Sequence, residues 1–465
     1  MKEFEAIGLW HLPADPSREV AGTLRYSDEE GLRLSLTGTF RESPGFSASE
    51  TGKKYPVVYG VVNDSPFGTV FTLLDCFETA STLRMPGLTT QTIRANRAYV
   101  SRCFVAEDAR FDAMRISFSH LYEWLNKRGM KADEARAAQS KFDLTLEYHN
   151  PDDVSFALAG KPTTIGVRCV TSESVFGEFS LRENASIYVD RLGQLSLEEM
   201  GKRYTGPLHN FFTLAADTPT AVEEEVAFSD QLRESENGHR LPVQILGQPV
   251  FRPKEGSGRR HRHEMLFTYR DVEASLGDLL NRWLDFSSEF SAFCGVFFSL
   301  LYAPGEYLET RFLSTIEAMI LFFGKSRSPD DATCRATETA RDRLLEPFSG
   351  KRREWAAMAF PTEAEVDFAW SLAAALKEHG EIMQPLVRSD PDAFVDAVAA
   401  THRYHIRYDP ACEARALREL GLHWATEKLS VLLKVCILDR LGIPREQISR
   451  FFARSRRYAY LKGVG

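Results

Sequence analysis

Hydrophobic and polar positions in the first part of the chain follow the pattern of β-strands. Some segments alternate strictly, as in GLRLSLTG at residues 31–38, and others are short runs of β-branched and aromatic residues. Strands are predicted at residues 31–38, 55–62, 69–76, 98–105, 111–118, 142–148, 163–170, 176–181 and 185–189. The turn-forming residues 63–68 predict a tight connection between two of these strands.

The period changes near residue 195. Ser196 is a candidate helix N-cap, with Glu199 three residues further on, which is the pattern of a capping box. A helix is predicted from there to about Ala215, with a break near Pro207. Residues 243–246 and 264–268 are predicted as the closing strands of the same domain.

From Asp271 onward, apolar residues recur at helical spacing. The stripes that predict helices are Leu276, Leu279, Leu280, Trp283 and Leu284; Leu308, Phe312, Ile316, Met319 and Phe323; Phe368, Leu372, Ala375 and Leu376; and Leu429, Leu432, Leu433, Cys436 and Ile437. A further stripe, Phe293, Phe297, Phe298, Leu300 and Leu301, suits a core or a dimer face. We therefore expect an α+β protein of two domains: a β-rich, sandwich-like domain at 1–270 and an all-α helical bundle at 271–465.

Composition is that of a soluble globular protein, with 465 residues, 43% hydrophobic and 26% charged. A net charge of −8 excludes nonspecific coating of nucleic acid but not a local basic site. The seven cysteines form no CxxC pair and read as reduced, free thiols. With no signal peptide and no apolar window long enough to span a bilayer, we expect a cytoplasmic protein that is not in a membrane.

One segment, residues 396–410, combines an apolar helical pattern with a dense set of candidate catalytic residues: His402, Arg403, His405 and Arg407. Such groups suit cleavage of RNA, because a histidine can take the proton of the 2′-OH and an arginine can stabilise the charge on the phosphate. That chemistry needs neither a metal nor another cofactor, and none is predicted. The alternative is a polar helix end, where cations favour the helix dipole and Pro410 stops the helix.

Other polar residues are weaker candidates. His261 and His263 lie in a basic loop at 253–263, where a solvated loop is a better interpretation than a metal site. Glu309, Arg311 and Glu317 suit either a structural ion-pair set or groups that face the active site. The motifs of phosphate-loop NTPases, α/β-hydrolases, zincins and Rossmann proteins are absent from the sequence.

Residues 271–465 resemble a HEPN domain of the ApeA-like group, and the N-terminal half resembles the β-rich domain of ApeA-type proteins. The resemblance in the C-terminal half is carried by residues 307–319 (YLETRFLSTIEAM), by residues 401–410 and by residues 429–444, which end in Gly442-Ile443-Pro444. In the N-terminal half it is carried by Gly8-Leu9-Trp10 and by the strand series that ends in residues 197–214. The resemblance implies a metal-independent ribonuclease of antiphage defence.

The sequence departs from that family at the catalytic pattern, which is an Arg, a polar residue, a short spacer and a His. Here the Arg position falls on His402, the polar position on Arg403 and the His position on Arg407, so the two roles are exchanged. His402 and Arg407 are about 140° apart around a helix, and a two-fold dimer can bring both pairs into one cleft.

The sequence is therefore compatible with two functions of different classes. The first is an endoribonuclease of abortive infection that cleaves RNA, with tRNA as a candidate, forms a homodimer through its helical domain and responds to a phage-derived protein. The second is a catalytically inactive HEPN-like module for dimerisation or nucleotide binding, with a β-domain that binds a protein or glycan.

Overall fold

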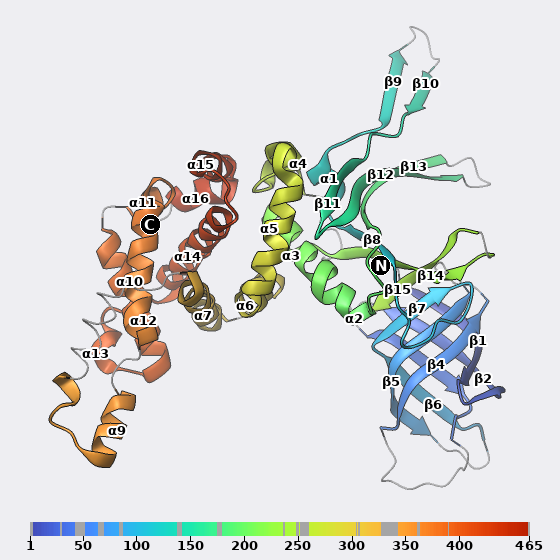
Figure 1. The fold of residues 1–465 in the computed structure, drawn as a ribbon, viewed down its shortest axis with the longest axis horizontal. Helices are drawn as coiled ribbons and strands as arrows, with labels where there is room; N and C mark the ends of the chain where they lie inside the picture. Colours follow the sequence, from blue (N-terminus) through green and yellow to red (C-terminus); the bar gives the residue numbers. More distant parts are fainter. Residues whose placement is uncertain are drawn as a thin grey trace. The chain divides into compact units, whose positions relative to one another are not determined.

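The computed structural model of the chain forms two compact units. Unit 1 comprises Met1–Phe212 and Thr220–Arg260, and unit 2 comprises Thr213–Pro219 and His261–Gly465. The structure describes residues 3–27, 30–41, 52–63, 69–82, 87–136, 142–173, 179–235, 238–247, 251, 260–303, 305, 307–326, 343–359, 363–388 and 390–463. A β-rich half followed by a helical half confirms the two-domain α+β class (Figure 1).

Unit 1 contains the strands. They are β1 (Phe4–Leu12), β2 (Asp15–Ser27), β3 (Gly31–Thr37), β4 (Lys54–Val62), β5 (Val70–Thr82), β6 (Thr90–Ala95), β7 (Arg97–Ser101), β8 (Ala113–Phe118), β9 (Met130–Arg136), β10 (Phe142–Tyr148), β11 (Val154–Leu158), β12 (Lys161–Glu173), β13 (Phe179–Val189), β14 (Val222–Arg233) and β15 (Arg240–Gly247). Strands β9 and β10 pair with each other, and the other thirteen form one sheet in the order β11-β12-β13-β8-β14-β15-β7-β5-β4-β1-β2-β3-β6.

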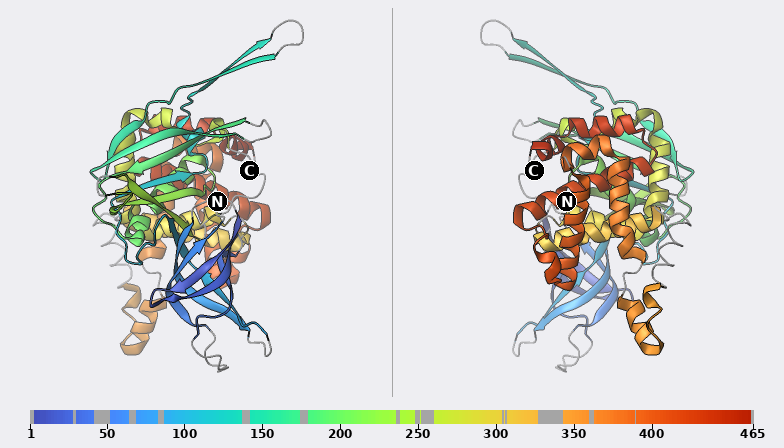
Figure 2. Two further views of the ribbon diagram at one scale, coloured as in Figure 1. Left: turned by 90° about the vertical axis from the view of Figure 1, so that its right-hand side faces the viewer. Right: turned by 90° about the vertical axis from the view of Figure 1, so that its left-hand side faces the viewer.

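The first six strands close on themselves. Strand β5 pairs with β4 and β7 and also with β6 at the end of the sheet, so β1 to β6 form a ring (Figure 2). We expected a sandwich-like packing, but one continuous sheet closes here because β6 finds hydrogen-bonding partners on both sides. Closure leaves no exposed strand edge within the ring.

Large apolar side chains fill the ring. Trp10, Leu24, Tyr26 and Phe71 are each fully buried, and they alternate with outward-facing residues along their strands. Gly60 lies opposite Trp10, and a Cβ atom at this position would come within 2.1 Å of the indole ring. The indole therefore needs a glycine at position 60.

Two details of the predicted elements in this region need correction. The segments at residues 176–181 and 185–189 belong to the single strand β13, with the start of the first outside the described residues. The helix is not interrupted at Pro207, because a π-helical turn (Gly201–Thr205) joins α2 (Leu197–Met200) to α3 (Gly206–Ala216), and Pro207 lies in the first turn of α3, where its missing N–H is tolerated. The capping box of Ser196 and Glu199 is confirmed.

The described helices outside α2 and α3 lie mostly in unit 2. They are α1 (Leu121–Leu125), α4 (Tyr269–Val272), α5 (Leu276–Glu289), α6 (Ser291–Tyr302), α7 (Leu308–Ser326), α9 (Gly350–Ala359), α10 (Glu363–Glu378), α11 (Gly380–Val387), α12 (Pro391–Arg407), α13 (Pro410–Glu413), α14 (Glu419–Arg440), α15 (Arg445–Arg454) and α16 (Arg456–Gly463), with short 3-10 turns at Arg262–Glu264 and Glu273–Ser275. Of these, only α1 belongs to unit 1.

The predicted strand at residues 264–268 is wrong. Leu266 and Phe267 are buried in the helical unit, where their N–H groups donate to the carbonyl of Ala215. Thr268 then caps α4, since its N–H donates to Asp271 at 2.8 Å. A short apolar run is buried here as an extended segment, without a neighbouring strand.

The apolar stripes predicted for the helical half lie in α5, α7, α10 and α14, and nearly all of their members are buried. Phe293, Phe297, Phe298 and Leu300 are buried as well, which settles their stripe as core within this chain. None of the described helices has, by itself, the length and apolar composition of a membrane span. The sharply bent pair Tyr269–Glu289 and Ser291–Tyr302 reaches that length and composition only when its two helices are taken together.

Helix α14 also buries charges. Lys434 pairs with Asp217, and Glu427 pairs with Arg457 and, at 3.1 Å, with Arg311. Burial lowers the pKa of the Lys434 ammonium, and Asp217 offsets only part of this effect. Burial also opposes ionisation of Glu427, but the arginines outweigh it and leave the pKa of this carboxyl below its usual value.

Lys434→Met should destabilise the helical unit by about 3–5 kcal/mol, because the buried Asp217 carboxylate would lose the ammonium group that pairs with it. Denaturant unfolding of the full chain measures this. Adding Asp217→Asn should recover most of the loss, since asparagine tolerates the positive φ of 52° at this position. Equal destabilisation in the single and double variants would show that the pair is not coupled.

Candidate active site on helix α12

Helix α12 has well-defined ends. The Asp390 side chain caps its first turn by accepting a hydrogen bond from the Ala393 N–H at 2.9 Å, and Pro391 occupies the first helical position. Tyr408 ends the helix in the left-handed conformation, with φ of 50°. Asp409 then caps α13, which begins at Pro410. The segment singled out from the sequence is therefore the C-terminal half of a helix.

Three of the four predicted site residues lie at one pocket. His402, Arg403 and Arg407 line it together with five other residues, which are Ile320 of α7, Phe368 and Ala369 of α10, and Ala399 and Ile406 of α12. Its volume is about 40 Å³, which is too small to hold a nucleotide. The lining residues of α12 recur at intervals of three and four and so cover one broad side of the helix, with His402 and Arg407 at its two edges.

His405 lies outside this lining. Its ring packs edge-on against Tyr404, with the ring centroids 5.4 Å apart. His405 and Arg407 also occupy the last turn of α12, where the helix dipole favours cations. The helix-end interpretation therefore accounts for these two residues, but not for His402 and Arg403 one turn earlier.

Buried contacts hold the site in place. Thr401, beside His402, is fully buried, and its hydroxyl donates to Ala397 at 2.6 Å and accepts from the Leu417 N–H at 2.8 Å. The imidazole of His402 lies against Phe368, with ring centroids 6.0 Å apart. Helix α12 is thus tied to the segment before α14 and to α10.

The other charged residues considered from the sequence lie elsewhere. Arg311 pairs with Glu427 of α14, while Glu309 and Glu317 are exposed, so within the described part of the chain the three do not form one ion-pair set. His261 and His263 stack on each other at 4.8 Å, and the first part of their loop, residues 252–259, lies outside the described residues.

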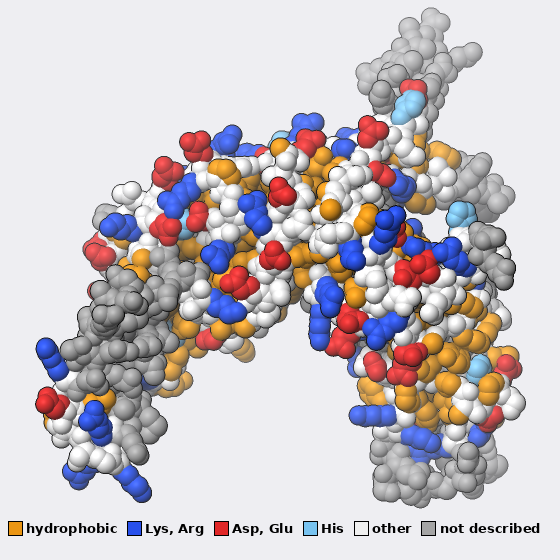
Figure 3. All heavy atoms as spheres, in the orientation of Figure 1, with side chains coloured by type: hydrophobic (Ala, Val, Ile, Leu, Met, Phe, Trp, Pro, Cys, Tyr) orange, Lys and Arg blue, Asp and Glu red, His pale blue; other side chains and the backbone are white. Residues whose placement is uncertain are grey.

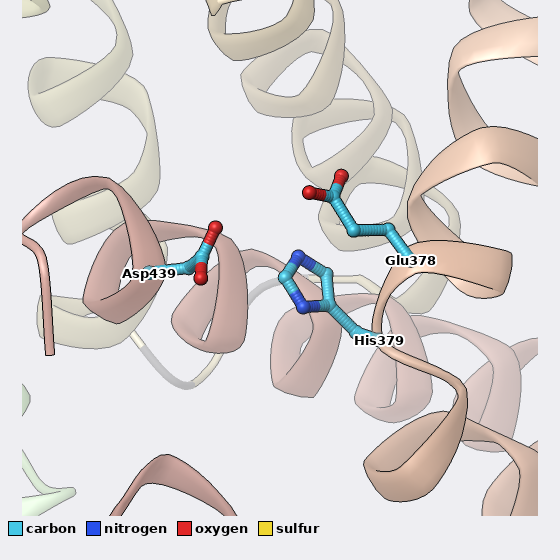
Figure 4. Close-up of side chains that lie close together, drawn as sticks. All are labelled: Glu378, His379 and Asp439. Carbon is cyan, nitrogen blue, oxygen red and sulfur yellow. The ribbon is translucent and has the colours of Figure 1, made fainter. Parts of the chain in front are cut away.

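A second polar cluster was not predicted from the sequence. Glu378, His379 and Asp439 place one possible ligand atom each within 4.8 Å of one another, and Figure 4 shows the three side chains converging. Among the described residues, this is the group whose geometry suits a metal ion. Nothing in the sequence indicated this cluster, because Asp439 lies on α14, far along the chain from Glu378 and His379.

Unit 1 carries an exposed apolar face on two strands of its ring. Ile7, Leu9 and Val61 are 66%, 47% and 47% exposed, and Leu9 is paired with Val61 across β1 and β4. Beside them, Phe104 packs against Tyr59 at 4.6 Å. Hydrophobic side chains are visible over this part of the surface in Figure 3. Exposed patches of this kind are typical of surfaces that bind another molecule.

The fold and the site define a two-domain protein with a β-rich N-terminal unit and a helical unit that presents a basic pocket. The family model described as ApeA N-terminal domain 1 matches residues 5–283, more than half of the chain, and the chain belongs to this family. Membership places it in the context of antiphage defence. No curated protein and no solved structure matches the chain. The family match ends in α5, before the helices that form the pocket.

Thr401→Val should destabilise the chain by about 1–3 kcal/mol, because it leaves the Leu417 N–H without its acceptor. The shift in the denaturant midpoint measures this loss. Thr401→Ser retains the hydroxyl and is the matched control. If valine and serine have equal effects, the hydroxyl does not anchor the helix.

Proposed function

We propose that this chain is a metal-independent endoribonuclease of antiphage abortive infection, for which tRNA is a candidate substrate. The observation that carries the proposal is that His402, Arg403 and Arg407 line one pocket at the surface. An imidazole beside two guanidinium groups is a set that can act on a phosphodiester. The family supports the context of defence, and the resemblance of the helical half to HEPN domains supports the type of reaction.

The small pocket suits the reaction if RNA lies across it rather than inside it. One phosphate of the backbone would bind Arg403 and Arg407, which offer planar, permanently charged donors. His402 would take the proton from the neighbouring 2′-OH, and the alkoxide would attack the phosphorus atom. The 5′-oxygen then leaves with a proton, and the products carry a 2′,3′-cyclic phosphate and a 5′-OH.

The exchange of arginine and histidine is compatible with this chemistry, since both residue types reach the same pocket. One histidine in a protomer supplies one proton-transfer group, whereas the reaction uses a base and an acid. A second protomer can contribute the other group. His405 remains the alternate within the chain, although it does not line the pocket.

His402→Ala and Arg407→Ala should each abolish toxicity of the induced protein. His402→Ala should lower RNA cleavage by about 10²–10⁴-fold, the usual contribution of one acid–base group. Arg407→Ala should lower it by about 10²–10³-fold, because it removes one group that stabilises the charge on the phosphate. Total RNA from induced cells, mapped for cyclic phosphate ends, measures cleavage, and DNA should remain intact because it lacks the 2′-OH. His423→Ala on α14 is the control, since His423 does not line the pocket.

Cleavage that persists in the His402→Ala, His405→Ala double variant would contradict this mechanism. So would activity that a chelator abolishes in protein that remains folded. If induction of the native protein yields no cleaved RNA, the alternative of a non-catalytic HEPN-like module is favoured.

We further propose that the chain forms a symmetric homodimer through its helical unit, so that two pockets face one cleft. Sedimentation at micromolar concentration should therefore give twice the mass of the chain. A strictly monomeric species that still cleaves RNA would contradict this arrangement. The exposed face at Ile7, Leu9 and Val61 is available for a different partner, and a phage-derived protein that triggers the nuclease is the partner that we propose for unit 1.

A further inference from the structure

The cluster of Glu378, His379 and Asp439 joins three helices of unit 2 at one point. Glu378 is the last residue of α10, His379 precedes α11, and Asp439 lies in the last turn of α14. The three ligand atoms lie within 4.8 Å of one another, and His379 is only 6% exposed (Figure 4). The imidazole is therefore held in place by its surroundings, while the carboxylates can adjust.

A pocket opens beside this cluster. It has a volume of about 190 Å³, and its polar lining comprises Glu378, His379, Glu381, Arg445, Glu446 and Ser449. Together with Asp439, four carboxylates accompany one guanidinium group, so carboxylates outnumber cations in this lining. The pocket thus has room for water ligands and an excess of negative charge.

Arg445 is the cation that forms ion pairs with the carboxylates of the cluster. Its guanidinium lies 2.8 Å from the Glu378 carboxylate and 3.6 Å from that of Asp439. The Arg445 side chain is 58% exposed, so these ion pairs are of the solvent-screened kind that stabilises little. A divalent cation that coordinates both carboxylates and the imidazole can displace the arginine at small cost.

We propose that Glu378, His379 and Asp439 bind a zinc ion, in competition with Arg445. One imidazole nitrogen and two carboxylate oxygens form a mixed set that suits Zn²⁺ better than Mg²⁺, which favours oxygen ligands alone. Three protein ligands leave a coordination position for water, which the adjoining pocket can hold. The ion would clamp the end of α10 and the start of α11 to the end of α14, and so stabilise the helical unit without entering the reaction at α12.

The test uses the full-length protein, treated with EDTA, dialysed and titrated with Zn²⁺ by calorimetry and with Co²⁺ by visible absorption. Native protein should bind one ion per chain, show the intense visible bands of four-coordinate Co²⁺ and unfold at a higher temperature with Zn²⁺. Asp439→Asn and Glu378→Gln should each weaken binding at least about tenfold, since even groups outside the ligand shell contribute 10–100-fold. These side chains are 32% and 36% exposed, so the variants should fold normally.

Arg445→Gln separates a metal site from a purely structural ion-pair cluster. It removes the competing cation and should tighten Zn²⁺ binding by about fivefold, because the ion no longer has to displace an ion pair worth roughly 1 kcal/mol. The double variant His261→Asn, His263→Asn is the matched control and should bind Zn²⁺ like the native protein. Binding that is absent, that is unchanged in Asp439→Asn, or that is lost in the His261/His263 control would overturn the proposal.

The outcome is distinguishable from failure of the proposed nuclease. If the zinc site exists, His379→Asn should lose the ion and unfold at a lower temperature, yet the protein that remains folded should still cleave RNA. Loss of cleavage in His402→Ala with normal Zn²⁺ binding would show that the two sites are independent. Loss of Zn²⁺ binding in His402→Ala would place the ion at α12 and refute the assignment to His379.

Discussion

The helical unit depends on the burial of two charged residues in its central helix. Lys434 and Glu427 lie in the interior face of α14, where ions are costly unless each finds a partner of opposite charge. The partners come from distant places: Asp217 follows α3, Arg311 belongs to α7 and Arg457 to α16. Each pair fixes one neighbour against α14 in a single register, because a displaced neighbour would leave an unpaired charge. Apolar packing alone would allow more freedom.

The pocket on α12 inherits its geometry from this arrangement. It combines residues of α7, α10 and α12, and α7 is itself tied to α14 through Arg311. Thr401 adds a local constraint, because its buried hydroxyl joins α12 to the segment before α14. The polar side chains of the pocket thus project from helices whose positions are fixed both by apolar packing and by buried ion pairs. Preorganised groups of this kind are what electrostatic stabilisation of a transition state requires.

The elements were predictable where the signal lies within one segment. Helical spacing in Leu429–Ile437 reflects burial on a single helix, and the capping box at Ser196 is a local pattern. Closure of the ring was not predictable, because it depends on pairing between strands, as when Gln91 of β6 donates to Glu78 of β5 at 2.9 Å. Likewise, His402, Arg403 and Arg407 are close in the sequence, whereas Ile320 and Phe368 complete their pocket from other helices. The cluster at His379 has no local signal at all, since its third member lies on α14.

The composition of the α12 face bears on what the pocket does. A helix dipole attracts cations to the last turn, and this alone would explain Arg407 and His405. It does not explain why His402 and Arg403 stand one turn earlier, on the same broad side of the helix as Arg407. Nor does it explain Ile406, which is 55% exposed amid these polar groups. A single exposed isoleucine is common on protein surfaces and is not by itself evidence of a partner. His402, Arg403 and Arg407 are therefore the groups that point to a bound molecule, and RNA, the substrate that we propose, would bring a phosphate to these cations.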